Sequence, residues 1–457
     1  MNQQQKTVLG VVLLLLFGGM ACCSLTLMLG AYGAYSEVKK AGPIADLFFD
    51  AGVVDDVPPP EDEDGPLKQQ FADEVLAGLA DAGHPEFVLD DERYGLTTDG
   101  GAQISLDNLF AEYARLEPEE RPEFVSHSIA GFFPAEIPEK WDDAKDGVLV
   151  TVRDRIFLEL LTLSAKEPVT LVHRPLAEDL IEVVVYDGPD AMQYLNEDHL
   201  RTWGKTADEV FRQGRQRLVA RSKKAFANPS PGVYESDWAD NHDVARALLS
   251  ESLKRLKLKG DPVVFLPQRD HLIVAGSADP EGLEAAVELV DERLTLPRAN
   301  SGRGWKVTRA GFEPWLPPAG SLAESLRVNA EADDANEQKR ALDEKFQAEG
   351  TDVFVGTTLF IEDDEGGRHT YAVWTKGAET LMPKAEFIVF VDLDQPEDQR
   401  VVAAARWDDV AAKLASRMKR EPCYWPVRYH LAKNSFPDRK TLDALALDPL
   451  FARNRAE

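Results

Sequence analysis

Cysteine is almost absent from this 457-residue chain, which carries it only at Cys22, Cys23 and Cys423. The single cysteine of the long polar part excludes an intrachain disulfide there and excludes a zinc site made of several thiolates. The chain also lacks a P-loop lysine motif, a GxSxG, an HExxH and a GxGxxG placed after a strand. The sequence therefore predicts no metal, no cofactor and no catalytic residue.

Positively charged residues are also scarce. Lysine and arginine total 51, against 80 aspartates and glutamates, and the formal net charge at pH 7 is −29. A chain this acidic repels nucleic-acid backbones and anionic headgroups over most of its surface. The composition therefore predicts no nucleic-acid partner and is typical of a soluble or salt-tolerant surface.

Charge of either sign is missing from a long N-terminal stretch. No charged residue occurs between Lys6 and Glu37, and residues 8–29 form a nearly continuous apolar run. A helix rises about 1.5 Å per residue, so about 20 apolar residues cross a hydrocarbon core of about 30 Å. We therefore predict a transmembrane helix in an N-terminal membrane anchor at residues 1–34, with the lipid bilayer as the partner of residues 8–29.

Two alternatives to an uncleaved anchor remain open. Small residues at 31–33 would allow cleavage of a secretory signal, and Cys22 would be the site of lipid attachment in a lipoprotein signal. The orientation is weakly determined, because Lys6 lies on one side of the run and Lys39 and Lys40 lie on the other. A short N-terminus before a long body favours a single-pass protein whose body lies outside the cytoplasm.

The remainder of the chain predicts an α+β protein in four parts. Residues 35–66 contain a proline run followed by an acidic run, which indicates an extended stalk. We expect a mixed α+β domain at residues 67–318, a charged helical spacer at residues 319–350 and a small C-terminal α+β domain at residues 351–457. The spacer has few apolar positions, so we expect its helix to be exposed.

Local patterns predict the elements of the larger domain. Apolar residues repeat every four positions from Leu67, as in an amphipathic helix. Gly95 is expected to break the chain between two strands, and Asp107 to cap the helix that follows. The alternation around Glu182 predicts a strand with one partly exposed face.

The second half of the larger domain has clearer signals. Thr206 and Glu209 form a capping box for a helix that extends to about residue 224. Asp243 is expected to cap another helix. Two apolar, β-branched runs at residues 262–266 and 271–275 predict a hairpin. In the C-terminal domain, residues 424–429 are expected to form a strand.

Residues 67–318 resemble the YtpQ-like bacterial family. The resemblance rests on FVLD at 87–90, ISLDNL at 104–109, Trp203 with TADE at 206–209, and most specifically LPQRDHLIV at 266–274, which is similar to that family's final Pro-x-x-Asp-x-Leu-Ile strand. The family has no established activity or catalytic residues, so the resemblance implies a fold and no function. This chain departs from typical members in its N-terminal run and in about 140 residues after the last hairpin.

Three adjacent acid–imidazole pairs are candidates for acid–base chemistry: Asp198-His199, His242-Asp243 and Asp270-His271. General-base catalysis needs the carboxylate, the imidazole and a nucleophile within hydrogen-bond reach. Neighbouring residues of a strand point to opposite faces, so Asp270 and His271 are not expected to form a dyad. The acidic segment at 362–367 lacks the alternating ligands of a calcium loop, and we expect a hairpin tip there.

One basic stretch contrasts with the acidic chain. Residues 205–228 carry seven lysines and arginines against two acidic residues, and Arg217, Arg221 and Lys224 share one face of the expected helix. These three residues are the predicted anion or partner contact. The alternatives are a solvated helix face and a contact with the chain's own acidic stalk at residues 55–64.

The absence of a recognised catalytic motif favours a membrane-anchored, non-enzymatic binding or regulatory module with a protein partner. One alternative is a membrane-tethered hydrolase whose carboxylates come together only in the fold. The other is a structural envelope protein. A pocket with converging carboxylates and imidazoles would favour the enzyme, whereas a basic or apolar surface would favour the binding module.

Overall fold

The computed structural model describes residues 65–91, 94–99, 103–165, 167–189, 191–363 and 366–452. The predicted anchor at residues 8–29 and nearly all of the predicted stalk lie outside these residues. In the ranges that are described, no helix combines the length and the apolar character needed to cross a bilayer. The described chain is a mixture of helices and several sheets, which confirms the predicted α+β class.

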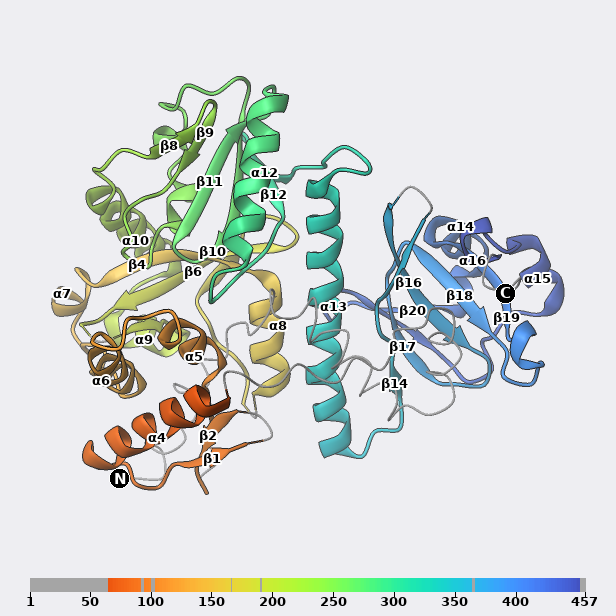
Figure 1. Ribbon diagram of the computed structural model, residues 1–457, viewed down its shortest axis with the longest axis horizontal. Helices are drawn as coiled ribbons and strands as arrows, with labels where there is room; N and C mark the ends of the chain where they lie inside the picture. The colour runs from red at the N-terminus through yellow and green to blue at the C-terminus, as the bar shows by residue number, and fades with distance from the viewer. Residues whose placement is uncertain are drawn as a thin grey trace. The chain divides into compact units, whose positions relative to one another are not determined.

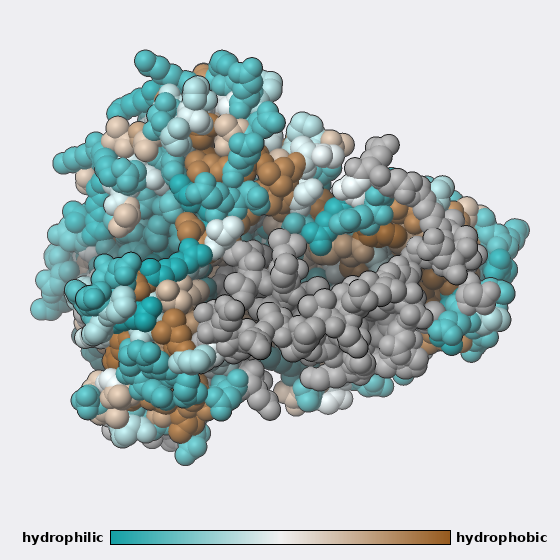
Figure 2. Space-filling model, viewed as in Figure 1, coloured by the Kyte–Doolittle hydropathy of each residue, from teal (hydrophilic) through white to brown (hydrophobic). Residues whose placement is uncertain are grey.

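The chain divides into two compact units. Of the described residues, the first unit contains those up to Phe157 and then Ala165–Trp315. The second contains Leu158–Ser164 and the residues from Leu316 onward. On the face shown in Figure 2, hydrophilic residues cover most of the described surface of each unit, as the acidic composition predicts.

The N-terminal part of the first unit packs helices on a three-stranded antiparallel sheet, with strand order β1-β2-β3. Its elements are α4 (Gly65–Asp81), β1 (Val88–Asp90), β2 (Gly95–Thr97), β3 (Gln103–Ser105), α5 (Asp107–Tyr113) and α6 (Arg121–Phe132). The four-residue repeat buries Phe71, Val75 and Leu79 completely, which confirms the predicted helix.

Two local predictions in this part are wrong. Gly95 does not break the chain but begins the central strand β2, where an added Cβ would lie 2.9 Å from the carbonyl oxygen of Ile104. Asp107 does not cap α5, because its carboxylate instead accepts a hydrogen bond from the hydroxyl of Ser105 at 3.2 Å. For Gly95 the neighbouring strand β3 decides the geometry, whereas for Asp107 a local contact with Ser105, two residues earlier, replaces the cap.

The rest of the first unit is built on two antiparallel sheets that share one apolar core. One sheet contains β4 (Val148–Asp154), β6 (Leu180–Asp187), β5 (His173–Pro175) and β7 (Met192–Tyr194). The other has the order β13 (Phe312–Pro314), β12 (Gly304–Val307), β10 (Pro262–Gln268), β11 (His271–Gly276), β9 (Val233–Glu235), β8 (Ala227–Ser230). The predicted hairpin is confirmed as β10 and β11.

Helices and short turns cover these sheets. They are α7 (Trp141–Ala144), α9 (Glu197–Trp203), α10 (Ala207–Arg221), η1 (Val244–Leu248), α11 (Ser250–Leu253) and α12 (Pro280–Leu294). Helix α8 (Arg155–Ser164) begins in this unit, and its residues Leu158–Ser164 belong to the second. Figure 1 shows α12 along the face of β10 and β11, while α10 packs on β4. Pro280 begins α12, and Ala286, Val287 and Val290 face the sheet.

The prediction of a half-exposed strand around Glu182 is wrong. β6 lies between β4 and β5 and is buried from Leu180 to Val185, so the Glu182 side chain has no exposed surface. Two arginines neutralise it: Arg174 of the neighbouring strand donates at 2.6 Å, and Arg215 of α10 makes two bonds of 2.7 and 2.8 Å. A buried carboxylate is tolerated here because both oxygens have charged donors.

The second unit contains two four-stranded sheets and the longest helix among the residues that the structure describes. One sheet has the order β14 (Phe354–Val355), β17 (Thr380–Pro383), β21 (Arg428–Leu431), β20 (Lys419–Glu421), and the other β15 (Leu359–Glu362), β16 (Arg368–Thr375), β18 (Phe387–Val391), β19 (Val401–Arg406). The helices are α13 (Leu322–Glu349), α14 (Trp407–Leu414), α15 (Arg439–Leu445) and α16 (Pro449–Ala452), with short turns η2 (Glu397–Gln399) and η3 (Ala415–Arg417). The expected hairpin tip at residues 362–367 is confirmed by the pairing of Glu362 with Arg368.

Helix α13 has the predicted ends but not the predicted exposure. Ser321 caps its first turn and Gly350 ends it in a left-handed conformation. Along its length, however, Leu326, Gln338 and Leu342 are buried, so the prediction of an exposed helix is wrong. The apolar positions are few, but most are alanines, which let the helix approach the sheet closely.

Arg428 fastens α13 to the sheet. It is completely buried and donates to Gln338 at 2.7 Å, to the carbonyl oxygens of Gly356 at 2.6 Å and Leu381 at 3.3 Å, and to that of Ala335. Strand β21 runs over Arg428–Leu431, so the strand predicted at residues 424–429 begins four residues later than expected.

Candidate functional site

The basic stretch forms helix α10 and the turn that follows it. The capping box is confirmed, because the Thr206 hydroxyl accepts from the Glu209 amide and the Glu209 carboxylate accepts from the Thr206 amide at 2.9 Å. Gly214 lies where the helix crosses β4, and an added Cβ would approach the Leu149 carbonyl carbon to 2.8 Å. This close crossing directs the basic face of α10 toward carboxylates of the same unit.

Two of the three predicted contact residues are paired inside the first unit. Arg217 lies 3.3 Å from the carboxylate of Asp146 and donates to its backbone oxygen at 3.1 Å. Arg221 donates to Asp187 at 2.5 Å. Each arginine side chain is 35% exposed, so these pairs lie at the surface and stabilise the fold by about 0–1 kcal/mol each.

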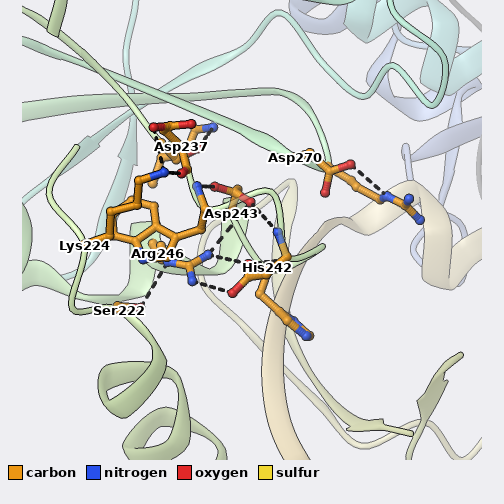
Figure 3. A network of polar contacts seen from close by, with 12 residues as sticks. Ser222, Lys224, Asp237, His242, Asp243, Arg246 and Asp270 are labelled. Carbon is orange, nitrogen blue, oxygen red and sulfur yellow. Dashed lines mark hydrogen bonds and ion pairs between the residues drawn. The ribbon is translucent and has the colours of Figure 1, made fainter. Parts of the chain in front are cut away.

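Lys224, the third predicted residue, does not share the helix face. Helix α10 ends at Arg221, and the chain then turns, so that Lys224 extends toward Asp237 and lies 2.7 Å from its carboxylate. Figure 3 shows this pair beside Arg246. The sequence pattern thus groups three residues that the structure separates, and only Lys224 reaches the cavity that opens after the helix.

That cavity, the basic pocket, has a volume of about 610 Å³. Its lining combines five cations with aromatic and aliphatic side chains: Ser222, Lys223, Lys224, Ala225, Phe226, Asn228, Tyr234, Trp238, Arg246, Leu249, Ser252, Arg255, Leu256 and Lys257. No carboxylate is among these lining residues. In the described part of the chain, Lys223, Arg255 and Lys257 make no ion pair within 4 Å, and all three are exposed.

Arg246 forms the buried wall of the basic pocket. Its side chain is 1% exposed and makes a two-bonded contact with Asp240, at 2.8 and 2.7 Å. It also donates to the Ser222 hydroxyl at 3.1 Å, and its guanidinium lies 4.3 Å from the centre of the Trp238 ring (Figure 3). The wall is therefore rigid, because Arg246 connects the end of α10 to the turn at residues 238–243.

The carboxylates behind this wall have shifted pKa values. Burial opposes ionisation of Asp240, but hydrogen bonds and charge from Arg246 outweigh it and lower the pKa. Burial raises the pKa of Asp243, which accepts from the backbone amide of Trp238 at 3.1 Å. Asp243 thus stabilises the turn before η1 and makes no side-chain cap, so its predicted capping role is wrong.

None of the three acid–imidazole pairs forms a hydrogen bond between its own two side chains. Figure 3 shows the His242 imidazole directed away from Arg246, and its Nε2 lies 3.3 Å from Asp187 instead of Asp243. His199 Nδ1 accepts from the Asn196 amide in a capping box. His271 bonds Glu235 at 2.8 Å, while Asp270 lies apart from the Arg246 network. The expectation that Asp270 and His271 form no dyad is confirmed.

Sequence reasoning missed most of the basic pocket. Of the five cations in the lining, only Lys223 and Lys224 belong to the basic stretch. The other three, Arg246, Arg255 and Lys257, follow more than 20 residues later and join it through the fold. The available signal was the recurrence of cations at 246–259 in an otherwise acidic chain. Comparisons of this chain with protein-family models, with curated proteins and with solved structures found no match.

Proposed function

We propose that this chain is a non-enzymatic binding module, tethered to a membrane through residues 8–29, whose first unit binds a small anion in the basic pocket. The observation that carries the proposal is the lining of the pocket, which has no carboxylate and five cations, three of them without an ion pair in the described structure. Its volume is in the range of small-molecule sites. The apolar run supports the tether, and an extracytoplasmic body is part of the proposal.

The acidity of the whole chain does not argue against such a site. At physiological ionic strength the Debye length is about 8 Å, so distant surface carboxylates are screened and the nearest charges dominate. Lys223, Arg255 and Lys257 line the pocket as exposed cations without a salt bridge in the described structure. The nearby carboxylates of Asp237, Asp240 and Glu251 are each already paired with another cation. Arg217 and Arg221, by contrast, already have carboxylate partners.

The proposal is tested with two triple variants of equal charge. One carries Lys223→Gln, Arg255→Gln and Lys257→Gln in the basic pocket; the other carries Arg212→Gln, Arg217→Gln and Arg221→Gln on helix α10, outside the pocket lining. The full chain in an uncharged detergent is titrated with phenyl phosphate by calorimetry. The pocket variant should lose about 10-fold or more in affinity, and the helix variant should change less than about 3-fold.

Equal losses in the two variants would show that only the overall charge matters and would overturn the pocket assignment. Following the phenyl phosphate by phosphorus NMR tests the non-enzymatic part of the proposal. Release of inorganic phosphate by wild type but not by the pocket variant would replace the binding module with the hydrolase. The resemblance of residues 67–318 to the YtpQ-like family stays a prediction and adds no activity to the proposal.

A further inference from the structure

The basic pocket is far larger than a simple inorganic anion requires. Its volume of about 610 Å³ falls inside the range of about 300–1,000 Å³ that is usual for organic ligands and cofactors. A phosphate ion held by two or three of the cations would leave most of the cavity to water. The size therefore points to a ligand with a body as well as a charged group.

The apolar part of the lining offers a surface for such a body. Phe226 and Leu256 are partly buried and pack against the core of the first unit, and Leu249 is buried. Tyr234 and Trp238 add two further rings, and Phe226 meets the Trp238 ring edge-on at 5.1 Å. These side chains are held in place by the fold, so a ligand's apolar surface can be buried on them at little entropic cost.

The polar part of the lining consists mostly of donors. Five lysine and arginine side chains line the pocket and no carboxylate does, so the lining favours a ligand rich in negatively charged oxygen atoms.

We propose that the ligand of the basic pocket is an organic phosphate monoester, with its phosphate at Lys223, Arg255 and Lys257 and its apolar body on Phe226, Leu249 and Leu256. This inference rests on the proposed anion-binding function and specifies its ligand class. A phosphate monoester carries a charge of about −1.5 to −2 at pH 7. That charge matches three exposed, unpaired cations better than the single charge of a carboxylate does.

The test compares ligands on the unchanged full chain, so it does not depend on a variant that folds. Phenyl phosphate, methyl phosphate, inorganic phosphate and phenol are titrated by calorimetry in the same uncharged detergent. Burying a phenyl ring should make phenyl phosphate bind about 10-fold or more tightly than methyl or inorganic phosphate. Phenol, which lacks the anion, should bind weakest.

Equal affinity of inorganic and phenyl phosphate would overturn this inference while leaving the anion-binding module intact. Absence of binding by every phosphate would overturn both. The variant Phe226→Ala sharpens the result, because it should weaken phenyl phosphate by several-fold and leave inorganic phosphate unchanged. A loss that is the same for both ligands would mean that Phe226 supports the fold and not the ligand body, and would overturn the placement of the body.

Such a monoester could come from solution or from a bilayer. Competition against phenyl phosphate by the short-chain lipid dihexanoyl phosphatidate distinguishes the two sources, since both share the phosphate monoester group. Stronger competition by the lipid supports a membrane ligand, and equal or weaker competition supports a soluble one. In either case the pocket triple variant should lose binding of both compounds, whereas retention of either would overturn the site.

Discussion

Two arginines are almost equally buried, one in each unit, and the fold satisfies them in opposite ways. Arg246 of the first unit is 1% exposed and bonds the carboxylate of Asp240 with both terminal nitrogens. Arg428 of the second unit is completely buried and bonds only neutral oxygens, three backbone carbonyls and the Gln338 amide. Burial lowers the pKa of Arg428 to about 9. Because this value is still above neutral pH, the side chain remains charged there.

The difference in hydrogen-bond partners indicates a structural role for Arg428 and a place in the candidate binding site for Arg246. Arg428 uses its donors to join α13 to the strands β17 and β21 and to the loop at Gly356, so it acts as a fastener between elements. Arg246 is held by the carboxylate of Asp240, with that of Asp243 3.9 Å away, and it lines the basic pocket with a side chain that is 1% exposed. In this protein, Arg428, whose partners are neutral, lies in a packed core. Arg246, whose partner is charged, lies beside a cavity.

The largest effect is expected for Arg428→Met. The variant leaves the carbonyl oxygen of Gly356 and the side-chain oxygen of Gln338 without their donor, whereas the Leu381 carbonyl keeps the backbone N–H of Gly356. Each buried acceptor without a donor costs about 1–3 kcal/mol, so we expect a loss of about 4 kcal/mol in the stability of the second unit. Hydrogen exchange measured by mass spectrometry should show lower protection in α13 and β21. The exposed Arg420→Met on β20 is the matched control and should change little.

A smaller loss is expected for Arg246→Met. This variant leaves Asp240 without its two-bonded partner, and Asp243, 3.9 Å from Arg246, also loses its nearest cation. Because Asp240 is partly exposed, water replaces some of the interaction, and we expect a loss of about 2–4 kcal/mol. Hydrogen exchange should show it at the end of α10 and in η1. A loss as large as that of Arg428→Met would contradict the comparison.

The two arginines should also differ in their dependence on pH. The folded-state pKa of Asp240 is lowered, so the stability it contributes is present above its unfolded pKa of about 3.9 and is lost as pH falls through the folded value. The difference between wild type and Arg246→Met should therefore shrink as the pH falls from 7 to 3. Urea unfolding monitored by exchange of each unit measures it. The difference for Arg428→Met should stay nearly constant, because no carboxylate bonds that arginine.

The contrast also shows what sequence reasoning could reach. Patterns that depend on residues close in the chain succeeded: the repeat from Leu67, the Thr206 capping box and the β10–β11 hairpin. Their physical cause is local, a helix face, a capped end or a pair of adjacent strands. The same reasoning failed for Glu182 and for α13, since a sequence does not show which face a distant element covers.

The candidate site could be predicted from the sequence only in part. The excess of cations in the basic stretch was visible, but the roles of Arg217 and Arg221 depend on Asp146 and Asp187, which are distant in sequence. A charge run does not reveal which of its members are neutralised by the fold. The cations that line the pocket are Lys223 and Lys224 of the basic stretch, Arg246 of η1, and Arg255 and Lys257, which follow α11.

The second unit also contains His369, a cation whose partners are carboxylates rather than the neutral oxygens that Arg428 contacts. The ring of His369 lies between two carboxylates, with Nδ1 2.9 Å from Glu386 and Nε2 3.0 Å from Asp363. A neutral imidazole has one donor and one acceptor nitrogen, so bonds to ionised carboxylates on both sides require the doubly protonated ring. Burial opposes the charge, but these hydrogen bonds outweigh it and raise the pKa of His369.

The smallest effect is therefore expected for His369→Gln, and it should depend on pH. Because the folded pKa is raised, the stabilisation is present below the unfolded pKa of about 6.5 and fades as pH rises through the folded value. Glu386 also bonds Arg406, and His369 is partly exposed, so screening limits the loss to about 1 kcal/mol. Thermal unfolding should show a deficit at pH 5.5 that disappears at pH 9, whereas the exposed His127→Gln should show none at either pH. If NMR titration gave His369 a pKa at or below the ordinary value of histidine, the contact of its ring with two carboxylates would be contradicted.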